Sequence, residues 1–305
     1  MKYSIVVPVF NAEKCLDELV ERVVKTVNSI TSEYEIILVD DYSEDNSWEI
    51  IKKHKKKFPE IIKGIRLSKN FGQHNATFCG IKHASGEFII TLDDDLEYDP
   101  EDIKQLIDAQ KNSEAQLVYG ESTKKKNSWI RTFFTLLYKL FSRSIHGKNK
   151  GRGSSFRLMK SSLAKSLLNN IGSFSFIDEF CQWHTNNIAF VSITSYDSKR
   201  GKSRYSLFKL SLITSEVILF SSVFPLRIIT GFGFLIALVN FLLGLFFIVK
   251  RLFFNIEVEG YTSLIVAVLF STGLIILSLG VIAEYISKIL KSQHHKPAFF
   301  EEKIL

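Results

Sequence analysis

Hydrophobic positions in the first 120 residues follow two alternating patterns. Short apolar runs rich in β-branched residues alternate with longer stretches in which apolar residues recur at helical spacing. The runs predict buried parallel strands at Tyr3–Val9, Glu35–Val39, Gly64–Leu67 and Glu87–Leu92, with Val118–Gly120 as a fifth. The longer stretches predict helices at Ala12–Ile30, Asn46–Lys57 and Phe71–Ala84, followed by one that Pro100 opens. This order predicts an open, Rossmann-like α/β sheet flanked by helices, with ligands at the carboxyl ends of its strands.

Two stretches near the end of the chain, Ile228–Val249 and Gly260–Ala283, contain no Asp, Glu, Lys or Arg. Twenty-two helical residues span about 33 Å, which is enough to cross a hydrocarbon core of about 30 Å. We therefore expect a two-helix transmembrane hairpin with spans at about 228–250 and 260–284. Basic residues flank both spans and are scarce in the loop between them, so both termini are expected in the cytoplasm.

The segment between the sheet and the spans is aromatic and basic. Trp129–Ile145 predicts either a helix lying in the membrane interface or a packed core helix, and Leu207–Leu226 is a second amphipathic stretch. We expect four parts in an inner-membrane protein. They are a cytoplasmic sheet domain at 1–206, an interfacial helix at 207–227, the two-span anchor at 228–290 and a cytoplasmic tail at 291–305.

The net charge of +7, from 39 Lys and Arg against 32 Asp and Glu, indicates anionic partners. Much of the basic excess lies in residues 123–160 and 199–209, which favours a membrane surface or phosphate ligands over nucleic acid. Hydrophobic residues make up 46% of the chain, and the three Cys form no CxxC pair. This composition excludes intrinsic disorder and a disulfide scaffold.

Acidic residues follow two of the predicted strands at the point where each strand ends. Asp40 and Asp41 follow the second strand, and Asp93, Asp94 and Asp95 follow the fourth. In an open α/β sheet these positions converge on one crevice. Clustered carboxylates repel one another and need a cation, and oxygen ligands suit Mg²⁺ or Mn²⁺, which bridge substrate phosphates. The sequence therefore predicts a metal and phosphate site, with a solvated acidic loop or a helix cap as the alternative.

Motifs along the chain resemble those of family 2 glycosyltransferases. In order they are IVVPVFNAE at 5–13, ILVDDYSED at 37–45, LSKNFGQHNAT at 67–77 and TLDDDLEYDPE at 91–101. GSSFRLM at 153–159, GKSRY at 201–205 and FPLR at 224–227 resemble the polyprenyl-phosphate glycosyltransferases, a subgroup similar to dolichyl-phosphate mannose synthase and bacterial undecaprenyl-phosphate glycosyltransferases. The resemblance covers essentially the whole chain. It implies a GT-A fold with a mixed, mostly parallel sheet flanked by helices. It also implies a nucleotide-sugar donor (UDP favoured, GDP-mannose the alternative) and a polyprenyl, undecaprenyl-type phosphate acceptor in cell envelope polysaccharide biosynthesis.

The resemblance also assigns roles by position. Its catalytic residues would be Asp93, Asp95, Lys202 and Arg204, and its metal ligands Asp93, Asp95 and Glu97. Its donor-binding residues would be Pro8, Asn11, Glu13, Asp40, Asp41, Asn70 and Asp94. Ser203 stands beside Arg204, the position that matches a phosphate-binding cation of the family. From their charge, and not from the resemblance, Arg131, Arg157 and Arg200 are further residues expected to meet the acceptor phosphate. At two positions where the family often has Arg, this chain has Ser122 and Ser198.

The negative charge of the acceptor phosphate predicts how sugar transfer would proceed. A lipid monophosphate has its second pKa near 6, so it is largely anionic at neutral pH and can attack the anomeric carbon without a strong base. The metal and basic side chains would stabilise the departing nucleoside diphosphate. A single displacement would invert the anomeric configuration. The anomeric configuration of the product would test this displacement. The resemblance further implies a transferase of the hexosyl type.

Two other functions stay open at this stage. A family 2 enzyme with a hydroxyl acceptor would need a general base, which Asp178 or Glu179 could supply. A non-catalytic membrane scaffold would tolerate a broken carboxylate set, yet Asp40, Asp93 and Asp95 are all present. The sequence leaves open which sugar and nucleotide are used, and whether the chain forms a homo-oligomer.

Overall fold

The computed structural model describes residues 1–123, 153–170, 177–196, 261–293 and 298–305, together with seven single positions between 235 and 253. The described residues up to 196 and from 298 onward belong to one compact unit. The helix α10, Tyr261–Gln293, belongs to a second unit. All strand-end acidic residues singled out above lie in the first unit.

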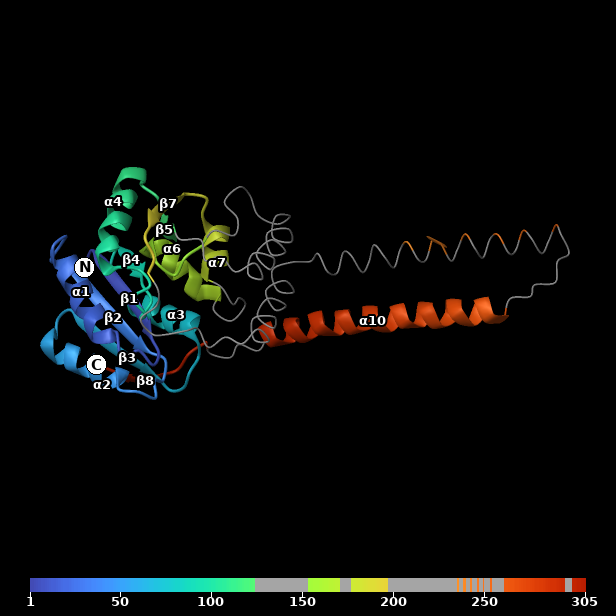
Figure 1. The fold of residues 1–305 in the computed structure, drawn as a ribbon, viewed down its shortest axis with the longest axis horizontal. Helices are drawn as coiled ribbons and strands as arrows, with labels where there is room; N and C mark the ends of the chain where they lie inside the picture. The colour runs from blue at the N-terminus through green and yellow to red at the C-terminus, as the bar shows by residue number, and fades with distance from the viewer. Residues whose placement is uncertain are drawn as a thin grey trace. The chain divides into compact units, whose positions relative to one another are not determined.

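An eight-stranded sheet of order β7-β5-β6-β4-β1-β2-β3-β8 forms the middle layer of the first unit (Figure 1). Its strands are β1 Tyr3–Val9, β2 Tyr34–Asp40, β3 Ile62–Leu67, β4 Phe88–Thr91, β5 Leu117–Ser122, β6 Arg157–Lys160, β7 Ile188–Ile193 and β8 Glu301–Ile304. The pairs β1–β2, β1–β4, β2–β3 and β5–β7 are parallel, whereas β6 and β8 pair antiparallel with their neighbours. The five predicted strands are confirmed to within two residues at each end, within a mixed sheet.

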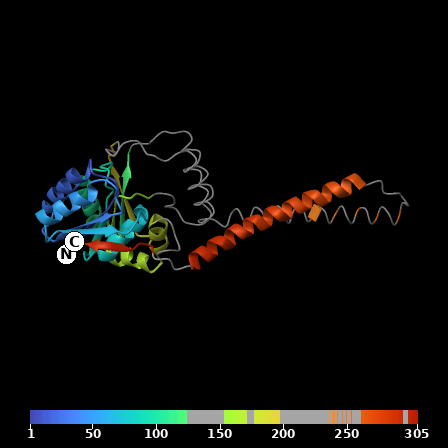
Figure 2. The ribbon, with the colours of Figure 1, turned by 90° about the horizontal axis from the view of Figure 1, so that it is seen from below.

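Helices cover both faces of this sheet (Figure 2). The helices are α1 Leu16–Asn28, α2 Ser47–Lys57, α3 Gln73–His83, α4 Ile103–Ser113, α6 Ser161–Ser166 and α7 Ile177–His184, with 3₁₀ turns at Pro100–Asp102 and Leu167–Asn170. Buried side chains of α1, α2 and α4 form one apolar core with one face of the sheet. Those of α3, α6 and α7 form a second core with the opposite face. Alternate residues along the inner strands, such as β1, β2 and β4, supply the two cores, as the period-2 geometry of a strand requires.

Helix α3 approaches β1 closely because residue 80 is glycine. An added Cβ at Gly80 would lie 2.3 Å from Val6 Cγ1, far inside van der Waals contact. We expect Gly80→Ala to lower the free energy of unfolding by about 1 to 3 kcal/mol through overpacking, measured by urea unfolding. Adding Val6→Ala should recover part of this loss. A Gly80→Ala protein as stable as the wild type would contradict the close approach.

The C-terminal part of the chain contains a strand that the sequence analysis did not predict. Residues 291–305 were expected to form a tail, but β8 pairs with β3 at the edge of the sheet. The second predicted span lies within α10, a helix of 33 residues. The first span, the interfacial helix and Trp129–Ile145 lie outside the described residues, apart from the single positions. Among the helices that the structure describes, none is both long enough and apolar enough to cross a membrane.

Candidate active site

The carboxyl ends of β1 and β4 lie at the switch point of the sheet. The order runs from β1 to β2 and β3 on one side, whereas β4 pairs with the other side of β1. Ligands of open α/β sheets bind in the crevice outside such a point. Asn11 follows β1 and the triplet Asp93–Asp95 follows β4, so both motifs stand at this crevice.

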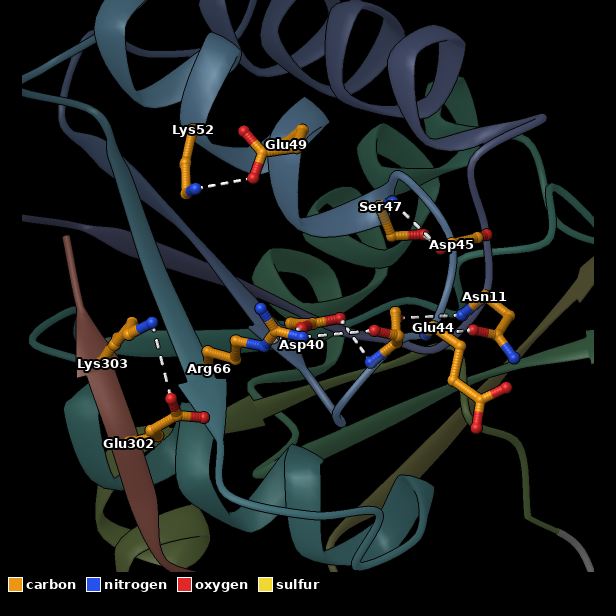
Figure 3. A network of polar contacts seen from close by, with 11 residues as sticks. Asn11, Asp40, Glu44, Asp45, Ser47, Glu49, Lys52, Arg66, Glu302 and Lys303 are labelled. Atoms are coloured by element: carbon orange, nitrogen blue, oxygen red, sulfur yellow. Dashed lines mark hydrogen bonds and ion pairs between the residues drawn. The ribbon is translucent and has the colours of Figure 1, made fainter.

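Side chains of the loop after β1 bind the loop after β2 (Figure 3). The backbone N–H of Asn11 donates to Ser43 Oγ at 3.0 Å, and Asn11 Oδ1 accepts from the Glu44 N–H at 2.9 Å. Glu13 Oε2 accepts from the backbone N–H and the side-chain amide of Asn46, both at 3.2 Å. Asn11 and Glu13, which the resemblance assigns to the donor, therefore join two loops that border the crevice.

Residues with strained backbone lie in the loops after β1, β2 and β4. Asn11, Tyr42 and Leu96 have positive φ angles of 51°, 61° and 57°. A non-glycine residue in this left-handed region costs about 1 to 3 kcal/mol and persists where its surroundings hold it there. Such residues concentrate at binding sites, so their position supports a functional crevice at these strand ends.

Asp40, the last residue of β2, is fully buried beside Arg66 of β3. Its Oδ1 accepts from the Ser43 N–H at 3.2 Å, whereas its Oδ2 lies 3.3 Å from Arg66 Nε and accepts no hydrogen bond from the described residues. Burial raises the pKa of Asp40, and the Ser43 bonds and the Arg66 charge oppose this rise. A buried oxygen without a donor is costly, so a ligand N–H or hydroxyl there would be stabilising. Asp40 is thus suited to bind a base or a ribose.

Asp41 uses both of its oxygens to hold the loop between β3 and α3. Oδ1 accepts from the Phe71 N–H at 2.7 Å and Oδ2 from the Gly72 N–H at 2.8 Å, and the residue is 2% exposed. Gly72 has a φ of 92°, a conformation that favours glycine. Asp41 therefore shapes the crevice through the backbone of this loop.

The charge of Asp41 should make stability depend on pH. Burial raises its pKa from 3.8 to about 6, although the Phe71 and Gly72 bonds oppose the rise. A carboxyl whose pKa is raised by folding stabilises the protein in its protonated form, and that contribution is lost as the pH rises through about 6. The rise corresponds to about 3 kcal/mol at most. We expect Asp41→Asn to gain stability relative to the wild type between pH 4.5 and about pH 7, measured by urea unfolding; a difference that is constant with pH would contradict this.

Asp94, the middle residue of the acidic triplet, is buried and bound to the loop after β1. Its Oδ2 accepts from the Phe10 N–H at 2.9 Å, and its carbonyl accepts from Cys15 Sγ at 3.0 Å. Asp94 therefore ties the β4 loop to the β1 loop across the switch point. Its neighbours Asp93 and Asp95 are partly exposed.

Asp93 is oriented by two other segments. Its Oδ1 accepts from Gln73 Nε2 at 2.6 Å, and its Oδ2 accepts from Ser155 Oγ at 2.5 Å. Asp95 Oδ1 accepts from the backbone N–H of Glu97 at 3.0 Å. Burial raises the pKa of Asp93 to about 6, and the charges of Asp95 and Glu97 add to this rise. The three carboxylates therefore lie close enough to repel one another.

This set of oxygen donors fits a hard divalent cation, which would relieve the repulsion. The carboxylates are not drawn tightly together, however. Among the described residues, one group of three potential metal ligands has its donor atoms within 4.8 Å of one another, and it is Cys79, His83 and Glu301. Asp93 and Asp95 would thus hold an ion together with oxygens of a bound diphosphate, and Glu97 stays a predicted ligand.

Arg157 of β6 is buried behind the acidic triplet. Its guanidinium forms an ion pair with Asp178 of α7, and its Nε donates to Thr91 Oγ1 at 3.2 Å. Thr91 in turn donates to the carbonyl of Ser155, the residue whose hydroxyl binds Asp93. Arg157, predicted to meet the acceptor phosphate, is therefore held inside the sheet by Asp178. Asp178, one of the two residues considered above as a general base, is thus engaged in this ion pair.

Comparison with known proteins identifies the family. The model of glycosyl transferase family 2 matches residues 4–176, which is more than half of the chain. The chain belongs to this family. The undecaprenyl-phosphate 4-deoxy-4-formamido-L-arabinose transferase of Shewanella sediminis is 30% identical over 305 residues, covering 99% of this chain and 92% of the relative. The enzyme of the same name from Proteus mirabilis is 28% identical over 307 residues, covering 100% of this chain and 94% of the relative.

Solved structures show the same fold as this family 2 glycosyltransferase. S. aureus TarS 1–349 in complex with UDP-GlcNAc has a TM-score of 0.50 at 20% identity, over 72% of this chain and 66% of that chain. Glucosyl-3-phosphoglycerate synthase from Mycobacterium tuberculosis, in complex with Mn²⁺, UDP and phosphoglyceric acid, has a TM-score of 0.50 at 17% identity, over 72% and 76%. The expected GT-A-like mixed sheet flanked by helices is confirmed.

The predicted site residues of this family 2 glycosyltransferase divide into two groups. Pro8, in the buried strand β1, and the exposed Asn70 belong to segments that border the crevice, with the residues described above. Lys202, Arg204, Arg131, Arg200 and Ser203 lie outside the described residues. Sequence reasoning missed Arg66, Gln73 and Ser155, which contact the key carboxylates. Gln73 and Ser155 lie inside quoted motifs, so the motifs could have suggested them, whereas Arg66 carried no signal.

Proposed function

We propose that this glycosyltransferase moves a sugar from a nucleotide-sugar donor to a polyprenyl phosphate at the cytoplasmic face of a membrane. The observation that carries the proposal is the match, over essentially the full chain, to transferases named for undecaprenyl phosphate. The carboxylates expected of such an enzyme are present at the carboxyl ends of β2 and β4. The charge-free stretches at 228–249 and 260–283 supply a reason for a lipid acceptor.

The donor would bind across the switch point. Asp40 offers a buried oxygen that accepts no hydrogen bond from the part of the chain that the structure describes, and this oxygen is suited to the base or ribose. UDP is the favoured nucleotide. Asp93 and Asp95 would hold Mg²⁺ or Mn²⁺, which when bound neutralises charge on the diphosphate. Gln73 and Ser155 fix the orientation of Asp93, so this ligand is positioned before the donor arrives.

The acceptor phosphate would act as its own nucleophile. It is largely anionic at neutral pH and needs positioning and desolvation more than deprotonation. The predicted basic residues at 200–204 and at 131 would supply that positioning. Attack opposite the leaving diphosphate in a single displacement inverts the anomeric carbon. A product with retained configuration by NMR would contradict this step.

The sugar we propose is an aminoarabinose derivative. The relatives named above transfer 4-deoxy-4-formamido-L-arabinose, a pentose derivative. The earlier expectation of a hexosyl type therefore has no support among them, and a UDP-linked formamido-arabinose becomes the first donor to test. An undecaprenyl-phosphate acceptor also implies association with the inner membrane.

The deciding experiment is an assay with purified full-length protein in detergent. It would receive undecaprenyl phosphate, Mn²⁺ or Mg²⁺, and UDP-4-deoxy-4-formamido-L-arabinose, UDP-glucose or GDP-mannose, with products identified by mass spectrometry. We expect a glycosyl-phosphoryl lipid with the arabinose donor and none without metal. Sugar transferred to a water-soluble hydroxyl acceptor and never to the lipid phosphate would overturn the proposal.

A further inference from the structure

The C-terminal strand β8 completes the sheet on the side of Asp40. It pairs antiparallel with β3, and bonds beyond the strand close both ends: the Ser68 N–H donates to the Phe300 carbonyl at 3.0 Å, and the Leu305 N–H to the Gly64 carbonyl at 2.8 Å. Without β8, β3 would be an unpaired edge strand of this sheet. The strand β8 therefore lies directly beside β3, the strand that contains Arg66.

Glu301 clamps β8 to helix α3. Its Oε1 lies 2.8 Å from Lys82 Nζ and 3.0 Å from His83 Nε2. Burial tends to raise the pKa of Glu301, but the bonds from Lys82 and His83 lower it overall, so the carboxylate is held as an anion. Cys79 Sγ lies 3.9 Å from the same oxygen. Because the Lys82 ammonium already supplies a cation here, we interpret this cluster as a clamp and not as a metal site.

A β-bulge directs the side chains of Glu301 and Lys303 in β8 to opposite faces of the sheet. Leu67 is opposite Glu301 and Arg66 is opposite Lys303, which leaves Glu302 as the extra residue. Side chains alternate along a strand, so residues 301 and 303 would share a face in a regular strand. With the bulge, Glu301 faces α3 while Lys303 lies on the face of Arg66. Bulges of this kind are common beside active sites, where they redirect a side chain.

Asp40, Arg66 and Lys303 are cross-strand neighbours in one row over β2, β3 and β8 (Figure 3). The Arg66 guanidinium lies against Asp40, and its Nη2 donates to the Ser43 carbonyl at 3.3 Å. It also lies 5.4 Å from the Tyr42 ring centre and 5.7 Å from that of Trp48. The Lys303 ammonium lies 3.5 Å from Glu302 Oε1, so its charge is engaged on β8 itself. The strand β8 therefore acts on Arg66 through the backbone pairing that holds β3 in place.

We propose that Arg66 is a positioning residue of the donor site and that β8 holds it against Asp40. Arg66 would keep Asp40 charged and aligned, and through Tyr42 and Ser43 it would fix the loop after β2. The inference rests on the proposed function in one respect, namely that Asp40 receives the base or ribose of the donor. It makes the C-terminal strand part of donor recognition, a role that none of the motifs assigned.

The first test concerns Arg66 in the full-length protein. We expect Arg66→Gln to raise the Kd for UDP and the KM for the nucleotide sugar roughly tenfold, the effect of one lost charge-assisted contact, with kcat within about twofold of wild type. Arg66→Lys should recover part of the affinity. The matched control is Lys63→Gln, which removes a cation from the opposite face of the same strand and should leave the Kd unchanged.

The second test removes residues 298–305. We expect the truncated protein to show a similar rise in KM, and a synthetic peptide of residues 298–305 added in trans should restore donor affinity. The same peptide with Glu301→Lys should not restore it, because it cannot bind Lys82 and His83. This peptide pair keeps the inference testable even where truncation lowers stability.

The outcomes separate the two proposals. An unchanged Kd in Arg66→Gln, or a truncated protein that binds UDP like the wild type, would overturn the inference and leave the proposed function intact. A parallel fall in kcat and unfolding midpoint without a specific rise in Kd would also overturn it, since that result indicates a structural role alone. A wild-type protein that binds no nucleotide would overturn the proposed function and the inference with it.

Discussion

Asp95→Ala should abolish sugar transfer to undecaprenyl phosphate while leaving the protein folded. Asp95 is partly exposed, and among the described residues its side chain accepts one hydrogen bond, from the nearby Glu97 N–H, so its loss should cost little stability. Removing one of two proposed metal ligands takes away several kcal/mol of charge stabilisation, which corresponds to a loss of at least about 100-fold in kcat/KM. Turnover would be measured by mass spectrometry of the lipid product.

The control for this variant is Asp108→Asn. Asp108 is an exposed carboxylate on α4, so its replacement tests the effect of removing one negative charge outside the crevice. We expect near-normal turnover from it. Mn²⁺ affinity, measured by electron paramagnetic resonance in the absence of substrates, should fall in Asp95→Ala and not in Asp108→Asn. Near-normal turnover of Asp95→Ala would contradict the proposal that Asp95 is a metal ligand.

Asp178→Asn should lower the free energy of unfolding by about 2 to 3 kcal/mol. Arg157 is 3% exposed, and Asp178 is its ion-pair partner, so the substitution leaves a buried guanidinium without its counter-charge. Breaking a buried pair costs about 3 to 5 kcal/mol, and we reduce the figure because Asp178 is itself about one-third exposed. Unfolding would be followed by urea titration. Transfer by the folded fraction should fall less than about tenfold, because the hydrogen bonds that the structure describes join Arg157 to Asp93 indirectly, through Thr91 and Ser155.

The same variant distinguishes the rival mechanism. If Asp178 were the general base for a hydroxyl acceptor, the folded fraction of Asp178→Asn would lose at least about 100-fold in kcat. Gly153→Ala offers a second route, because an added Cβ would lie 2.6 Å from Asp178 Cγ and displace the carboxylate. We expect it to destabilise the protein in the same way. A loss of this size in the folded fraction of both variants would support Asp178 as the general base.

The strands and the carboxylates after them could be predicted because the signals are local. An apolar run such as Tyr3–Val9 reports burial on both faces, and parallel strands must place their carboxyl ends at one edge. Asp40 and Asp93 therefore came together in the prediction without any knowledge of their partners. The helix pattern was likewise readable, although α1 begins at Leu16 and not at Ala12, because residues 11–15 form a loop that is bonded to the loops after β2 and β4.

What each carboxylate does could not be read in the same way. Residues 93, 94 and 95 are all aspartates, yet their contacts differ. Asp94 accepts from the Phe10 N–H, whereas Asp93 accepts from Gln73 and Ser155. These partners lie 20 to 84 residues away along the chain. A hydrogen bond depends on atoms within about 3 Å, and no local pattern encodes which distant donor reaches that position.

The sequence by itself determined the class of this protein: an α/β sheet with acidic strand ends, followed by charge-free stretches, in the motif order of family 2 glycosyltransferases. Only the tertiary structure decided that Asp41 binds the Phe71 and Gly72 N–H groups and that Arg66 faces Asp40. It alone also placed Glu301–Ile304 beside β3. A short edge strand owes its conformation to the backbone groups of its neighbour, so its own four residues carry too weak a pattern to reveal it.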